Sequence, residues 1–240
     1  MNNEFMELKS EFNLIKQKKY IKSIYKDNGS AGKMFETLLN KKLDNKQLPD
    51  FKNIEIKTTA GSDKYPISLF SCCPSKKNYS NNETLLYLIN RYGYILHENC
   101  KCLMINVQEN KIKYCKNGYG FMIKVSYKWK KIYLCIFYNR KIFDTSIYWT
   151  FDDIKNIFNK KMRQLACVKY NQKIINSNKY FYYHTLNCYF LKSFDDIIFA
   201  LKNGIISINF NLLMNNEVFR YHGINFVIYE KDLLSIYNKI

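Results

Sequence analysis

Three residues in one short segment have the types and spacing that phosphodiester hydrolysis requires. Asp50, Glu55 and Lys57 form the pattern Asp-(x)4-Glu-x-Lys within PDFKNIEIKT, residues 49–58. Because side chains alternate between the two faces of a β-strand, a strand over residues 53–58 places Glu55 and Lys57 on one face and the two isoleucines on the core face. Asp50 precedes this strand across an expected turn, so its carboxylate can reach the side of Glu55.

Two carboxylates this close repel each other unless a cation lies between them, and hard oxygen ligands suit Mg²⁺. A lysine beside the metal can orient or deprotonate a water and neutralise the charge that develops at phosphorus. Asp50 and Glu55 are therefore the candidate metal ligands, and Lys57 is the candidate catalytic lysine.

The bare pattern leaves a structural role open, because an acid and a lysine on the polar face of an amphipathic strand look the same. Glu36, fourteen residues before Asp50, could supply a third acid that binds a second cation or orders water. A solvated glutamate on an exposed helix face is the commoner situation.

The elements around these residues predict a mixed α/β or α+β domain. Apolar residues at helical spacing extend over residues 3–26, and DNGS at 27–30 supplies turn residues and a plausible N-cap for a helix over 31–40. Further helices are expected over 83–91, 151–161, 195–202 and 231–237, and strands over 53–58, 67–71, 102–107, 121–125, 132–137, 164–170, 180–190, 205–210 and 223–229. The three strands between 102 and 137, separated by turns, predict a meander.

The net charge favours a polyanionic partner. Thirty-eight Lys and Arg against twenty Asp and Glu give +18, which attracts nucleic acid. The many Asn, Ile, Tyr and Lys residues also fit an A·T-rich genome, so charge alone does not decide. No long apolar run or secretory signal is present, so we expect a cytoplasmic protein with no membrane partner and reduced cysteines.

Several motifs resemble the MutH-like branch of the PD-(D/E)XK nucleases, and most closely the MvaI/BcnI restriction endonucleases. The resemblance covers most of the chain from about residue 29 onward. Its blocks are GSAGKMFE at 29–36, LPDF at 48–51, IEIKT at 54–58, LFS at 69–71, QLACVK at 164–169, KYFYY at 179–183, SFDD at 193–196, GIISINF at 204–210 and RYHGINF at 220–226.

The resemblance implies a type II restriction endonuclease with a MutH-like fold, a central mixed sheet flanked by helices. It implies one nuclease domain over residues 1–240, with room for a second, smaller lobe that forms a DNA cleft. Asp50, Glu55 and the backbone carbonyl of Ile56 would hold Mg²⁺, Lys57 would be catalytic, and Glu36 would be the supporting acid. Double-stranded DNA would be cut by a monomer, and a cognate DNA methyltransferase is expected genetically.

The candidate DNA-binding residues carry alternatives. Arg220 could contact guanine or merely a phosphate or a surface acid, and His222 could contact DNA or form only local hydrogen bonds. Lys169 could approach the scissile phosphate or be an ordinary exposed lysine, and His184 ends an aromatic run that is otherwise typical of a core strand. Where relatives often carry charged residues, this chain has Asn209 and Asn211, which would read different base edges.

Two other functions stay open at this point. One is a MutH-like nickase that cuts one strand when partner proteins recruit it. The other is a DNA-binding protein whose nuclease site has decayed, although all four expected active-site residues are present.

Overall fold

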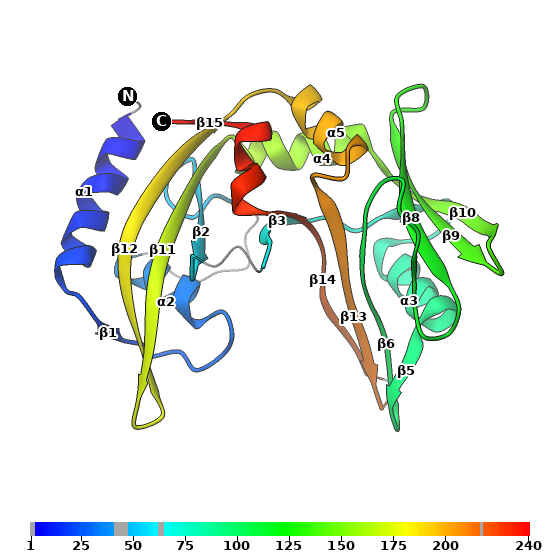
Figure 1. Ribbon diagram of the computed structural model, residues 1–240, viewed down its shortest axis with the longest axis horizontal. Coiled ribbons are helices and arrows are strands. Elements are labelled where there is room, and N and C mark those ends of the chain that lie inside the picture. The colour runs from blue at the N-terminus through cyan, green and yellow to red at the C-terminus, as the bar shows by residue number, and fades with distance from the viewer. Residues whose placement is uncertain (1–2, 41–47, 62–64, 217) are drawn as a thin grey trace. The chain divides into compact units, whose positions relative to one another are not determined.

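The computed structural model describes residues 3–40, 48–61, 65–216 and 218–240, and the chain divides into two compact units (Figure 1). Unit 1 comprises Met1–Ile67, Ile157–Lys192 and Leu233–Ile240, and unit 2 comprises Ser68–Asn156 and Ser193–Asp232. Both units contain strands and helices, which confirms the mixed α+β class. Among the described residues, no helix is both long and apolar enough to span a membrane. The expected cleft between two lobes stays a prediction.

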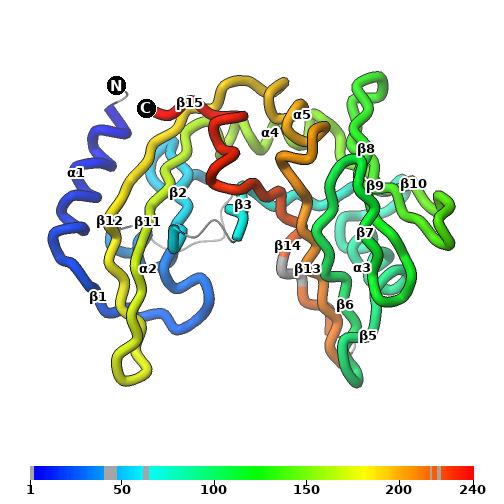
Figure 2. The backbone as a smooth tube through the Cα atoms, in the orientation of Figure 1, coloured from blue at the N-terminus to red at the C-terminus, as the bar shows by residue number. Residues whose placement is uncertain are grey.

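Unit 1 is built on a mixed sheet. Its strand order is β1-β12-β11-β2, with β15 also paired to β12, and only the β2–β11 pair is parallel. The strands are β1 (Ile21–Lys22), β2 (Ile54–Thr59), β11 (Gln164–Ile175), β12 (Asn178–Leu191) and β15 (Tyr237–Lys239). β11 and β12 run side by side to their connecting turn and extend beyond the strands predicted over 164–170 and 180–190 (Figure 2).

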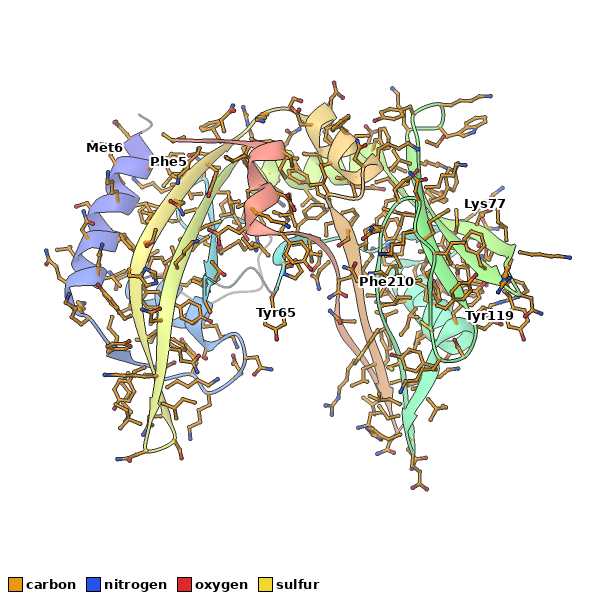
Figure 3. The ribbon with its side chains drawn as sticks, in the orientation of Figure 1. Phe5, Met6, Tyr65, Lys77, Tyr119 and Phe210 are labelled. Carbon is orange, nitrogen blue, oxygen red and sulfur yellow. The ribbon has the colours of Figure 1, made fainter. Side chains whose placement is uncertain are left out.

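Helix α1 (Asn3–Gln17) packs on β12 through an apolar stripe. Phe5 points toward the sheet whereas Met6 points away from it, and their exposed fractions are 2% and 54% (Figure 3). The prediction of helical structure over residues 3–26 is wrong beyond Gln17. Lys19 adopts a left-handed φ of 56°, and the following residues form β1, whose backbone pairs with β12.

Helix α2 (Ser30–Leu38) lies where residues 31–40 predict a helix, but its start differs from the prediction. The N-cap is Gly29, which has no side chain to accept a hydrogen bond from the first turn. Its buried residues join the core of unit 1 with those of α1, β2, β11 and β12, among them Phe35, Ile54 and Ile56. The two isoleucines of β2 therefore face the core, as the alternation predicts.

The helix predicted over 151–161 changes form near its end. It begins as α4 (Phe151–Ile157) and continues as the π-helix η1 (Phe158–Met162), which packs against β2. The closing helix predicted over 231–237 is also different. It is the 3-10 helix η2 (Glu230–Ser235), after which residue 237 begins β15 because its backbone pairs with the end of β12.

Unit 2 contains two five-stranded sheets, with orders β4-β10-β9-β8-β7 and β3-β14-β13-β6-β5. The first comprises β4 (Ser75–Lys76), β7 (Lys113–Tyr114), β8 (Gly120–Ser126), β9 (Lys131–Tyr138) and β10 (Lys141–Thr150), and the second comprises β3 (Ile67–Ser71), β5 (Tyr94–His97), β6 (Cys100–Val107), β13 (Ser207–Asn215) and β14 (Val218–Ile228). The meander prediction is correct for β8 and β9 but wrong for β6, because β6 pairs with β5 and β13 instead.

The core of unit 2 is aromatic. Trp149 is fully buried, contacts the rings of Phe210 and Phe226, and donates its indole N–H to the carbonyl of Cys72 at 3.0 Å. Helices α3 (Asn81–Tyr92) and α5 (Phe194–Lys202) lie close to the predicted ranges 83–91 and 195–202. Gly204, with a left-handed φ of 68°, follows Asn203, the C-cap of α5.

A carboxylate in unit 2 gives a stability prediction. Asp144 accepts hydrogen bonds from the hydroxyls of Tyr92 at 2.5 Å and Tyr87 at 3.0 Å, and from the Ser146 amide at 2.7 Å. Burial opposes ionisation, but these hydrogen bonds, led by that of Tyr92, lower the pKa of Asp144 below its usual value. A lowered pKa stabilises the folded state above the unfolded pKa of about 3.9, and this contribution is lost as the pH falls through the folded pKa.

We therefore expect Tyr92→Phe to lower the free energy of unfolding at pH 7 by about 1–2 kcal/mol, and to lower it less at pH 3. Urea unfolding at both pH values measures this. Tyr138→Phe is the control, because the Tyr138 hydroxyl has no hydrogen-bond partner among the described residues. Equal losses for Tyr92→Phe at the two pH values would contradict the assignment.

Candidate active site

A tight turn brings Asp50 back to the strand that carries the other candidate residues. Phe51 and Ile54 pair through two backbone hydrogen bonds of 2.9 and 2.7 Å, and Lys52 between them has a φ of 52°. The Asp50 carboxylate then accepts a hydrogen bond of 2.9 Å from the amide of Ile56. The expected turn between Asp50 and the strand is therefore present.

This hydrogen bond also places the carbonyl of Ile56. The N–H and C=O of one residue in a strand point to the same side, and those of the next residue point to the opposite side. Among the described residues, β2 pairs with β11 alone, and the amide of Ile56 points to the opposite edge, where Asp50 accepts from it. The Ile56 carbonyl lies on that same edge, so a carboxylate oxygen and a backbone oxygen are neighbours there.

Glu55 is the most unusual group of the site, because its carboxylate is only 1% exposed. One oxygen, Oε1, accepts from Lys57 Nζ at 2.8 Å and lies 3.2 Å from Lys161 Nζ. The other oxygen, Oε2, is buried without a hydrogen-bond partner in the described structure. Burial raises the pKa of the Glu55 carboxyl, and the charge of Asp50 adds to this, while Lys57 and Lys161 offset it only in part.

The unpartnered oxygen is the test of whether a cation fits here. A buried carboxylate oxygen without a partner is costly, and a hard divalent cation would satisfy it. No group of three or more His, Cys, Asp or Glu side chains that could hold a metal occurs within the described ranges. A metal at this place would therefore combine Glu55 and Asp50 with a backbone oxygen, for which Ile56 is suitably placed.

Glu36 lies on α2 rather than on the strand. A Cβ added at Gly32 would come within 3.3 Å of Thr58 Oγ1, so α2 approaches β2 closely at this glycine. Glu36 is one turn further along the same helix face and is half-buried. It therefore lies on the side of α2 that faces β2, although it does not join Asp50 and Glu55 in a three-acid cluster.

Of the two DNA-binding candidates in unit 1, one shares the sheet face of the site. Lys169 on β11 is in register with Thr59, two residues beyond Lys57, and is half-buried. A Cβ at Gly61 would lie 3.6 Å from its side chain. His184 instead lines a cavity of about 360 Å³ between β12 and α1, and its Nδ1 is 2.9 Å from the hydroxyl of Thr185.

The remaining candidates lie in unit 2. Asn209 and Asn211 are half-buried on β13, Arg220 is exposed on β14, and His222 is also on β14, although its side chain lies outside the described structure. The register places Asn209 between Asn225 of β14 and Asn106 of β6. The side-chain amides of Asn106, Asn209 and Asn225 therefore form a row across three neighbouring strands. Sequence reasoning missed Asn106 and Asn225, because only strand pairing reveals the row.

Comparison with known proteins then identifies the family. The family model described as the MvaI/BcnI restriction endonuclease family matches residues 9–237. The chain belongs to this family. It is a restriction endonuclease of the type II, site-specific class, and so an enzyme that hydrolyses DNA.

Two solved structures of another member of the family support this. The restriction endonuclease MvaI in complex with its cognate DNA substrate matches with a TM-score of 0.91, and MvaI in the absence of DNA matches with 0.63. Both are 26% identical to this chain and are matched over 100% of this chain and 98% of theirs. No match was found among curated protein sequences. The expected family resemblance and restriction-endonuclease fold are confirmed.

Proposed function

We propose that the chain binds Mg²⁺ through Asp50, Glu55 and the carbonyl of Ile56, and cuts double-stranded DNA at a short recognition sequence. The observation that carries this proposal is the buried Glu55 carboxylate, whose Oε2 is unpartnered while Oε1 is held by lysine ammonium groups. Restriction endonucleases generally depend on a metal, and these oxygen donors suit Mg²⁺. When bound, the ion would supply positive charge to the phosphate and lower the pKa of a water.

The chain's own residues then complete the reaction. The Lys57 ammonium orients the attacking water and stabilises the extra negative charge on the phosphorane-like transition state. Glu36, on the face of α2 that approaches β2, is the supporting acid that orders water. The water oxygen forms a bond to phosphorus as the bond from phosphorus to the 3′ oxygen breaks. The leaving oxygen takes up a proton, which gives 3′-hydroxyl and 5′-phosphate ends.

DNA recognition is assigned to residues of both units. In unit 1, Lys169 shares a sheet face with Lys57 and is proposed to contact a phosphate. The other proposed DNA-binding residues are His184, Asn209, Asn211, Arg220 and His222. Asn and Arg side chains suit bidentate contacts with adenine and guanine, so the three in unit 2 are proposed to read bases. The side-chain amide of Asn209 has no hydrogen-bond partner among the described residues, which leaves it available for such a contact.

Two further features belong to this proposal. We propose that the enzyme acts as a monomer, and that a DNA methyltransferase of matching specificity protects the host genome. A partner-dependent nickase and a binding-only protein are the alternative functions, and the following experiment separates them.

We expect purified protein to convert unmethylated plasmid and phage DNA into discrete fragments with Mg²⁺, and to leave the DNA intact in EDTA. Gel electrophoresis detects the fragments, and sequencing of their ends gives the recognition site and the cut. Nicked circles as the final product would instead favour the nickase. Specific binding without cleavage, with any divalent metal, would favour the decayed enzyme.

A further inference from the structure

The Glu55 carboxylate forms an ion pair with a second lysine, Lys161, which lies outside the Asp-(x)4-Glu-x-Lys pattern. Lys161 belongs to η1, far from β2 in the sequence, yet its Nζ lies 3.2 Å from Glu55 Oε1. The Lys161 side chain is 25% exposed, close to the 23% of Lys57, whereas Glu55 is 1% exposed. Two partly buried ammonium groups therefore converge on the same oxygen of one buried carboxylate.

The backbone around Lys161 is fixed on both sides. Phe158 and Met162 of η1 are buried, and the carbonyl of Met162 accepts a hydrogen bond of 2.9 Å from the hydroxyl of the buried Tyr237. The carbonyl of Arg163 accepts a hydrogen bond of 2.9 Å from the amide of Leu191. A π-helix has a wider turn than an α-helix and occurs frequently at functional sites. Here it ends where β11 begins, beside β2.

We propose that Lys161 is a positioning residue for Glu55, an inference that rests on the proposed metal site. Lys161 and Lys57 together hold Oε1, and this fixes the rotation of the carboxylate so that Oε2 faces the place of the metal. A single ammonium group would leave the carboxylate free to turn both oxygens toward it. Partners that orient a metal ligand commonly affect activity by about 10–100-fold.

The neighbouring lysine provides a matched control. Lys160 is on the same turn of η1 and lines with Lys161 a cavity of about 380 Å³. Lys160 is exposed and forms no ion pair with a residue that the structure describes. Removing either lysine removes the same charge from the same segment, but only Lys161 reaches Glu55.

The first test is independent of cleavage. Unfolding temperatures are measured in EDTA for the wild type, Lys161→Met, Glu55→Gln and the double variant. We expect Lys161→Met to lower the unfolding temperature by about 2–4 °C when Glu55 is present, and to leave it unchanged in the Glu55→Gln background. Equal effects in both backgrounds would overturn the proposal.

The second test uses cleavage of duplex DNA at saturating Mg²⁺. We expect Lys161→Met to lower kcat at least about tenfold without a change in KM for DNA, Lys161→Arg to restore most of the loss, and Lys160→Met to match the wild type. A kcat for Lys161→Met within twofold of the wild type, or an equal loss in Lys160→Met, would refute the positioning role. A wild type that never cuts with Mg²⁺ would contradict the proposed function. The unfolding temperatures of the four proteins in EDTA would still decide whether Lys161 holds Glu55.

Discussion

Replacing Lys57 with methionine is expected to lower the rate of Mg²⁺-dependent cleavage by about 10²–10⁴-fold. Methionine keeps most of the apolar stem of lysine, so the packing of the half-buried side chain is largely preserved. The variant loses the ammonium group that we propose orients water and stabilises charge at phosphorus. Since no proposed base contact involves Lys57, DNA binding in EDTA is expected to stay within about threefold of the wild type.

Single-turnover cleavage and gel-shift titration of the same duplex measure the two quantities. Lys52→Met is the matched control, because Lys52 is exposed on the turn before β2 and pairs with Glu7 of α1. This control is expected to cut at the rate of the wild type. Normal cleavage by Lys57→Met would show that the catalytic lysine is misassigned, and a parallel loss of DNA binding would indicate a role in binding instead.

The sequence could predict the local part of this site because that part depends on short-range geometry. Strand alternation alone separates Glu55 and Lys57 from the isoleucines, and the core position of both isoleucines confirms it. The turn before the strand also follows from its sequence position. The additional hydrogen bond from the Ile56 amide to Asp50 was not predictable, because it requires the Ile56 amide to point away from β11, and the strand that pairs with β2 cannot be read from local spacing.

The distant part of the site depends on strand pairing and could not be predicted from spacing. Lys161 reaches Glu55 because β2 pairs in parallel with β11, and η1 ends immediately before β11. His184 ends an aromatic run, but no local pattern specifies that it lines a cavity against α1. The wrong prediction for the pairing of β6 has the same cause, since a β-rich run does not specify which strand it pairs with.

Glu55→Gln is expected to abolish cleavage without destabilising the metal-free protein. The glutamine has almost the same shape, but it removes a buried negative charge that the two lysines compensate only in part. Lys57 and Lys161 are each about a quarter exposed, so their ammonium groups can turn toward water after the substitution. The unfolding temperature in EDTA should therefore equal or exceed that of the wild type, and Mg²⁺ should no longer raise it.

Glu109 of unit 2 is the matched control for this substitution, because it is also a buried glutamate paired with a lysine. Its two oxygens are both satisfied, one by the Val125 amide at 2.6 Å and the other by Lys202 Nζ at 2.7 Å. Glu109→Gln is therefore expected to lower the free energy of unfolding by about 1.5–3 kcal/mol while Mg²⁺-dependent cleavage persists below the unfolding temperature. If Glu55→Gln were as destabilising as Glu109→Gln and still cut DNA, Glu55 would be a structural residue. The opposite pattern, stability retained and cleavage lost, is expected of a carboxylate kept for binding a metal at the cost of stability.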